Sequence, residues 1–144
     1  ISRAYDLLGR LTTLTYPEGE YVTYTYNAQG GIETTTKHTA DSTQQTAVVS
    51  NVEYNAAGQI TKIVYGNGVV SDYTYNPQTL RLNRLLSTGP TGTLQDFRYT
   101  FDAVGNVTQI QDLVHTGSQT FAYDALNRLL RKDYTEPSTL NLEP

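Results

Sequence analysis

The feature that most constrains this chain is a seven-residue motif that occurs six times in 144 residues. Each copy has an aromatic residue, Asp or Asn, two variable residues, usually Gly, a polar residue and an aliphatic residue. The aromatic residues that begin the copies are Tyr5, Tyr26, Tyr54, Tyr75, Phe101 and Tyr123. A constant motif with connections of variable length is typical of repeat proteins, in which each copy is one structural unit.

Each copy of the motif predicts a tight hairpin turn. Asp or Asn at the second position accepts hydrogen bonds from nearby backbone amides. Gly or Asn at the fifth position tolerates the positive φ that closes a short hairpin with a bulge. The predicted turn residues are Asp6, Gly9, Asn27, Gly30, Asn55, Gly58, Asn76, Asp102, Gly105, Asp124 and Asn127.

The fourth copy departs from this pattern. Pro77 stands where proline suits a type I turn, but Thr79 occupies the position that requires positive φ. We therefore expect a longer loop that rejoins the pattern at residues 83–86, which mirror residues 127–130.

The segments before the turns alternate with a period of two, as in Val22, Tyr24 and Tyr26, which predicts strands. Further turn signals between the copies divide each repeat into two strands. With 12 Tyr and many Thr residues, the composition also favours strands. The sequence predicts an all-β fold, a serpentine of antiparallel β-hairpins that forms a curved sheet. The six motif aromatics would pack as a cross-strand ladder.

The six repeats fill residues 1–134. Within them, the polar segment 37–45 is predicted to be a surface loop. Residues 135–144 carry no strand signal and are expected to be a tail or linker. Because the chain begins at Ile1 rather than Met, we expect it to be a piece of a longer protein.

Composition excludes several functional classes. The absence of Cys removes disulfides, thiolate nucleophiles and cysteine-bound metal centres. A net charge of −4 argues against binding to nucleic acid or to an anionic membrane surface. No apolar run approaches the ~20 residues that a membrane-spanning helix needs.

The residues that could carry chemistry form no catalytic, metal or cofactor site. His38 and His115 lie in polar stretches without metal-ligand spacing, so both are expected to be solvated or locally hydrogen-bonded. The motif Asp and Asn residues are not paired catalytic carboxylates, because half of them are Asn. The motif supplies too few acidic ligands for calcium, and Gly66 and Gly68 lack the third glycine of a phosphate loop. We expect a protein without enzymatic activity or cofactors.

The motif resembles the signature of the YD-repeat, or Rhs-repeat, family. Residues 5–11 (YDLLGRL) are nearly a consensus copy. Three longer stretches, 75–82, 94–106 and 123–129, resemble the repeat region of the B and C components of bacterial insecticidal toxin complexes.

This resemblance implies that the sheet is part of a hollow β-shell that encloses a C-terminal toxin or effector. The implied partners are the remaining repeats of a parent chain or a partner shell component, and the enclosed toxin. The implied setting is a secreted or cell-surface bacterial protein that contributes to virulence. The family's self-cleavage region is marked by an Asp-Pro pair, which this sequence lacks, so autoproteolysis is not assigned to this chain.

Two other kinds of interaction follow from the residues themselves. An exposed face of tyrosines could stack on sugars, so an adhesin-like module that binds carbohydrate or a cell surface is the alternative function. The free edges of an open sheet could also pair with another copy, which predicts edge-to-edge self-association.

Overall fold

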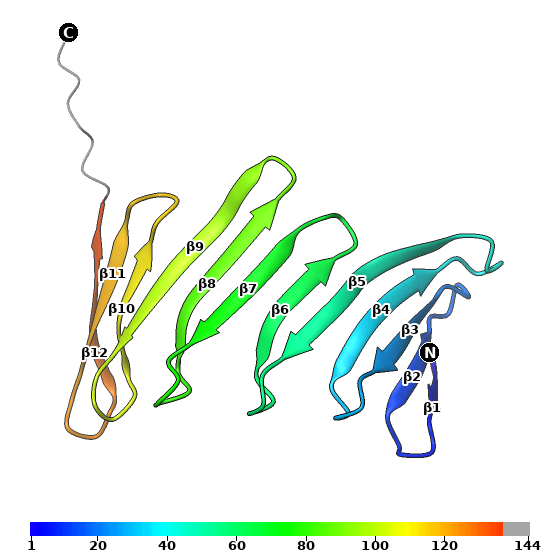
Figure 1. Ribbon diagram of the computed structural model, residues 1–144, viewed down its shortest axis with the longest axis horizontal. Coiled ribbons are helices and arrows are strands. Elements are labelled where there is room, and N and C mark those ends of the chain that lie inside the picture. The colour runs from blue at the N-terminus through cyan, green and yellow to red at the C-terminus, as the bar shows by residue number, and fades with distance from the viewer. Residues whose placement is uncertain (137–144) are drawn as a thin grey trace, which may run out of the picture. The chain divides into compact units, whose positions relative to one another are not determined.

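The computed structural model describes residues 1–136, and these residues form strands and turns without a helix (Figure 1). Accordingly, this part of the chain contains no helix long and apolar enough to cross a membrane. Within each of the two compact units described below, the strand order follows the chain order. The chain forms two compact units, Ile1–Ser71 and Asp72–Pro144, with the boundary inside β7 (Val70–Tyr75).

In the first unit each strand pairs antiparallel with the next strand of the chain. Its strands are β1 (Ser2–Tyr5), β2 (Leu11–Thr15), β3 (Tyr21–Tyr26), β4 (Ile32–His38), β5 (Gln45–Tyr54) and β6 (Ile60–Tyr65). The motif turns connect β1 to β2, β3 to β4 and β5 to β6, so they lie at the same end of the strands (Figure 1).

In the second unit the same antiparallel pairing runs from β8 to β12. The strands are β8 (Leu82–Gly89), β9 (Gly92–Phe101), β10 (Val107–Asp112), β11 (Ser118–Tyr123) and β12 (Leu129–Thr135). Together the strands confirm the prediction of an all-β serpentine of antiparallel hairpins.

The motif also determines the register of its hairpins. The register shifts just before the aromatic residue of the copy, between Ala4 and Tyr5, Thr25 and Tyr26, Glu53 and Tyr54, and Ala122 and Tyr123. A shift of this kind is a β-bulge, which increases local twist and re-aims the side chain beside it. The aromatic residue is therefore turned toward its neighbours by the geometry of its own hairpin.

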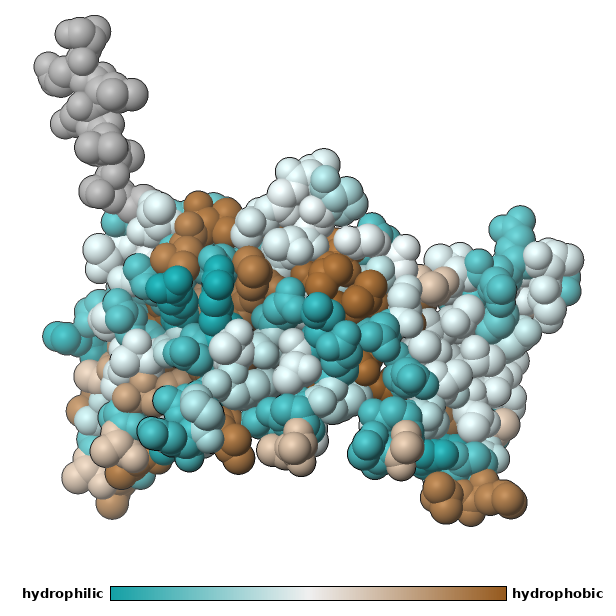
Figure 2. All heavy atoms as spheres, viewed as in Figure 1, coloured by the Kyte–Doolittle hydropathy of each residue, from teal (hydrophilic) through white to brown (hydrophobic). Residues whose placement is uncertain are grey.

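The sheet buries little apolar surface. Among residues 1–136, Val52 is the one buried hydrophobic residue, at 8% exposed, and most strand residues are half-buried. The two variable motif positions project fully into solvent where they are apolar, as at Leu7, Leu8, Val104 and Leu126. Figure 2 shows such apolar surface at the lower right, at the turn between β1 and β2. Hydrogen-bonded strands, rather than a thick core, hold this structure together.

The surface loop predicted at 37–45 is found at residues 39–44, between β4, which continues through His38, and β5, which begins at Gln45. Two other local predictions are corrected. The long loop of the fourth copy ends earlier than expected, since β8 begins at Leu82. Thr135 ends β12 rather than beginning a tail, and residues 137–144 of the predicted tail lie outside the described residues.

Candidate functional site

The motif turns are closed by the side chain at their second position. In the first copy, Oδ1 of Asp6 accepts hydrogen bonds from the backbone amides of Leu8 and Arg10, each at 2.9 Å. The amide of Gly9 donates to the backbone oxygen of Asp6 at 3.0 Å, and Gly9 has φ of +76°. Glycine, which lacks a Cβ, adopts this left-handed backbone conformation without steric cost.

The same arrangement recurs in the other short copies. The second-position side chains of Asn27, Asn55, Asp102 and Asp124 each accept hydrogen bonds from the backbone amides two and four residues later. Positive φ is found at Gly30, Gly58, Gly105 and Asn127. Because one amide or carboxylate oxygen makes both bonds, Asp and Asn serve the turn equally well.

The fourth copy keeps this chemistry in a loop that is one residue longer. Oδ1 of Asn76 accepts from the amides of Gln78 and Thr79 at 2.9 and 3.0 Å. The left-handed residue is Leu80, with φ of +56°, instead of the residue before it. The insertion moves the sixth and seventh motif positions to Arg81 and Leu82.

Successive copies are joined by tyrosine hydroxyls. The hydroxyl of Tyr26 donates to the backbone oxygen of Leu11 at 2.7 Å, and Tyr54 donates to Ile32 at 2.8 Å. Tyr123 makes the same bond to Val107 at 2.9 Å. In each case the first residue of one copy binds the seventh residue of the copy before it. These tyrosines are half-buried, and each spans from its own hairpin to the preceding one.

The sixth motif position makes a second connection between copies. Nε of Arg10 donates to Asp6 at 2.7 Å, and its guanidinium carbon lies 4.5 Å from the ring centre of Tyr26 in the next copy. A guanidinium over an aromatic face is attracted by the ring quadrupole. In the fifth copy, Nδ2 of Asn106 donates a hydrogen bond to Asp102 of its own turn at 2.9 Å. It also donates to Oδ1 of Asn127, in the sixth copy, at 2.9 Å.

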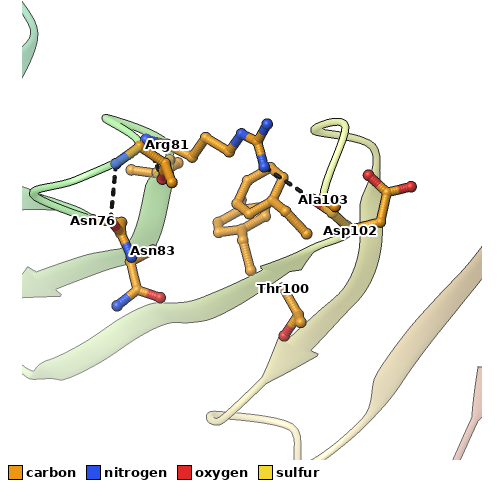
Figure 3. A pocket seen from close by; sticks show the side chains of 10 residues that line it. Asn76, Arg81, Asn83, Thr100, Asp102 and Ala103 are labelled. Carbon is orange, nitrogen blue, oxygen red and sulfur yellow. Dashed lines mark hydrogen bonds between the residues drawn. The ribbon is translucent and has the colours of Figure 1, made fainter.

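Arg81 makes the corresponding connection from the fourth copy to the fifth. Its guanidinium carbon lies 5.7 Å from the ring centre of Phe101, and Nη1 donates to the backbone oxygen of Asp102 at 2.9 Å (Figure 3). A hollow of about 460 Å³ lies beside this contact. We call the contact between two successive copies a joint. Phe101 has no hydroxyl, so Arg81 supplies a polar link at a joint where the tyrosine hydrogen bond cannot form.

The turn carboxylates are held in the charged form. The backbone amide of Arg10, with its guanidinium, keeps the pKa of Asp6 below its ordinary value. The backbone amide and the guanidinium of Arg128 act in the same way on the pKa of Asp124. Partial desolvation raises the pKa of Asp102, but hydrogen bonds from Asn106 and from backbone amides outweigh it, and the pKa is lowered. These groups are stable turn anions, unlike a general base poised near neutral pH.

A part-buried ion pair in the second unit was not predicted from the sequence. Nε and Nη2 of Arg84 donate to the two carboxylate oxygens of Asp96, each at 2.7 Å. Asp96 is 8% exposed, and the hydrogen bonds from Arg84 lower its pKa. Opposite charges on β8 and β9 are visible in the sequence, but the register that brings them together is not. The pair is a structural brace between two strands.

The histidines take part in local contacts. The ring of His38 stacks on Tyr21 with centres 4.4 Å apart, and its Nε2 lies 3.0 Å from the hydroxyl of Thr23. Nδ1 of His115 lies 2.8 Å from Asp112 in the same loop. Within residues 1–136, no three His, Cys, Asp or Glu side chains are grouped so that they could hold a metal ion.

The comparison with protein families agrees with this repeated geometry. The model of the RHS Repeat family matches residues 5–44 and 54–94, which together make up more than half of the chain. This chain belongs to the RHS repeat family. No curated protein sequence matches it.

Solved structures share the fold of this RHS repeat chain. A TcdB2-TccC3 crystal structure superposes with a TM-score of 0.82 at 27% identity, over 90% of this chain and 7% of that chain. TcdB2-TccC3 without its hypervariable C-terminal region gives 0.82 at 29% identity, over the same shares. A Photorhabdus luminescens Tc holotoxin pore shares the fold at a TM-score of 0.73 and 22% identity, over 95% of this chain and 9% of that chain.

These structures confirm the resemblance to toxin complex components. The RHS repeat chain spans less than a tenth of the length of the proteins it resembles. The residues matched by the family model, 5–44 and 54–94, include the first four copies of the motif.

Proposed function

We propose that this chain is a non-catalytic segment of an RHS-repeat shell that encloses a C-terminal toxin or effector. The observation that carries the proposal is the recurrent bond from the tyrosine hydroxyl of one copy to the backbone oxygen of the copy before it. A joint that is repeated from hairpin to hairpin lets a sheet be extended by adding copies, as a long wall requires.

The use of the tyrosines supports a structural role over the carbohydrate-binding alternative. Sugar-binding platforms present aromatic rings to solvent. In contrast, the hydroxyls of Tyr26, Tyr54 and Tyr123 are bonded to backbone, and their rings are half-buried. These three tyrosines are therefore occupied by contacts between repeats.

The exposed apolar turn residues also fit a wall segment. Leu7, Leu8, Val104 and Leu126 project from the motif turns into solvent. Isolated sheets with little core are covered by other parts of a protein or assembly. In the proposal, further repeats of a parent chain or a partner shell component cover this rim and the edges of the sheet, and a lone segment self-associates by its edges. The parent is a secreted or cell-surface bacterial protein that contributes to virulence.

Protease protection of the enclosed polypeptide tests the proposal. The intact protein that carries this segment is treated with protease, and cleavage of its C-terminal region is followed by mass spectrometry. The region should be protected, and a double variant, Tyr26→Ala with Tyr54→Ala, should expose it by weakening the wall. Equal cleavage rates in the wild type and in the separated C-terminal region would contradict enclosure. A panel of hydrolase substrates should show no turnover.

A further inference from the structure

The joint between the second and third copies lacks the side chain that fills the corresponding joints. In the first copy Arg10 lies over the ring of Tyr26, and Arg81 lies over Phe101 in the second unit. The sixth position of the second copy is Gly31, which has no side chain. A hollow of about 830 Å³ lies at this joint.

The hollow is lined by groups that suit a cation with several N–H donors. It is formed by residues that include Asn27, Gln29, Gly31, Glu53, Tyr54 and Asn55. Tyr54 supplies an aromatic ring, and Glu53, which is opposite Lys62 in the sheet, supplies an exposed carboxylate whose Oε1 accepts a 3.4 Å hydrogen bond from Nδ2 of Asn51. An aromatic face and a carboxylate together are the surroundings in which a guanidinium is bound in proteins.

A backbone acceptor completes the comparison with Arg81. That guanidinium donates to the backbone oxygen of Asp102, which also accepts from the amide of Gly105. Asn55 is the equivalent residue in the third copy, and its backbone oxygen accepts from the amide of Gly58 at 3.0 Å. A carbonyl oxygen has two lone pairs, so Asn55 can accept a second donor in the way Asp102 does.

The chain cannot fill this space from position 31. A Cβ on Gly31 would lie 2.8 Å from Cζ of Tyr54, closer than real Cβ contacts. A side chain there would displace the ring of Tyr54, which packs against Gly31. A side chain that fills the hollow would have to come from elsewhere.

We propose that the hollow beside Tyr54 binds a guanidinium group, presented as an arginine side chain of another polypeptide. The arginine lies on the ring of Tyr54, pairs with Glu53 and donates to the backbone oxygen of Asn55. It thus contacts the two kinds of group, an aromatic ring and a backbone oxygen, that Arg81 contacts at its own joint.

Titration of the isotopically labelled chain with N-acetyl-arginine amide, followed by NMR, tests this site. Saturable shifts are expected at the amides of Gly31 and Gly58 and at the ring of Tyr54, with smaller shifts at Tyr26, whose joint is filled by Arg10. N-acetyl-citrulline amide has a similar shape without the charge and should give no saturable shift. Equal shifts with both probes, or shifts spread over other joints, would overturn the proposal.

Two variants sharpen the test. Glu53→Gln should weaken binding of N-acetyl-arginine amide about two- to fivefold, the range expected for an exposed ion pair. Arg10→Gly should create a second site at Tyr26, because it opens the first joint and leaves the Asp6 carboxylate in place. The second copy shows that the turn forms with glycine at this position. Unchanged affinity in Glu53→Gln, or no new shifts at Tyr26 in folded Arg10→Gly, would refute the guanidinium site.

Discussion

The hydroxyl of Tyr26 lies 2.7 Å from the backbone oxygen of Leu11 and donates a hydrogen bond to it. The two residues are the first position of one motif copy and the seventh position of the copy before. The bond therefore explains why a tyrosine begins the motif, whereas the backbone acceptor places no requirement on the side chain at the seventh position. One hairpin supplies the donor, and its neighbour supplies the acceptor.

Removing this hydroxyl should weaken the joint without removing the ring. We expect Tyr26→Phe to lower the free energy of unfolding by about 0.5–1.5 kcal/mol, the usual net contribution of one hydrogen bond. Tyr5→Phe is the matched control, because Tyr5 has the same motif position, is exposed, and has no hydroxyl partner among residues 1–136. Urea unfolding of both variants measures the difference. Equal stabilities would show that the bond contributes nothing.

The left-handed turn positions should tolerate asparagine but not β-branched residues. Gly9→Asn is expected to be nearly neutral, because Asn127 has φ of +60° at the equivalent position. Gly105→Val should cost about 1–3 kcal/mol through backbone strain. Its Cβ would also lie 2.8 Å from Nη2 of Arg81, whereas a Cβ on Gly9 meets nothing within 4 Å.

Comparing Gly9→Val with Gly105→Val separates strain from crowding. Both variants place valine at a positive φ, +76° at Gly9 and +108° at Gly105, and only Gly105→Val also displaces Arg81 from Phe101. We expect the larger loss of thermal stability in Gly105→Val. An unchanged unfolding midpoint in both variants would overturn the assignment of these glycines to turns.

Stability should depend on pH through the turn carboxylates. The pKa of Asp6 is lowered from its ordinary value of 3.8 by the amide and guanidinium of Arg10. A lowered pKa in the folded state stabilises the protein above 3.8, and this contribution is lost as the pH falls below that value. Asp6→Asn keeps the turn, as Asn27 does in the second copy, but lacks the charge.

The expected result is a difference in melting temperature that depends on pH. Wild type should melt above Asp6→Asn at pH 7, and the two should converge in strongly acidic solution. Thermal unfolding followed by circular dichroism across this range measures the effect. A difference that stays constant with pH would show that the charge of Asp6 is not responsible.

The Arg84–Asp96 pair should contribute to the stability of the second unit. Asp96→Asn removes the charge from a buried acceptor of two 2.7 Å hydrogen bonds, so we expect a loss of about 1–2 kcal/mol. Asp133→Asn provides a comparison, because its ion pair with Arg131 is exposed and should contribute little. Similar losses in the two variants would argue against a special role for the part-buried pair.

The hairpins could be predicted because their determinants lie within seven consecutive residues. The oxygen of Asp6 and the left-handed Gly9 act on the backbone beside them, so their spacing in the sequence is also their spacing in the turn. The fourth copy was harder to place. Thr79 signalled a longer loop, but which residue would take positive φ depended on where β8 begins, and the structure assigns it to Leu80.

The sequence by itself determined that this protein consists of repeated antiparallel hairpins, because alternation and turn chemistry are local properties of the chain. Only the tertiary structure decided what the repeats do to each other. The bond from Tyr54 to Ile32 and the ion pair from Arg84 to Asp96 depend on the register between strands. Register is set by bulges and by the pairing of distant residues, and a shift of one residue turns a side chain to the other face of the sheet.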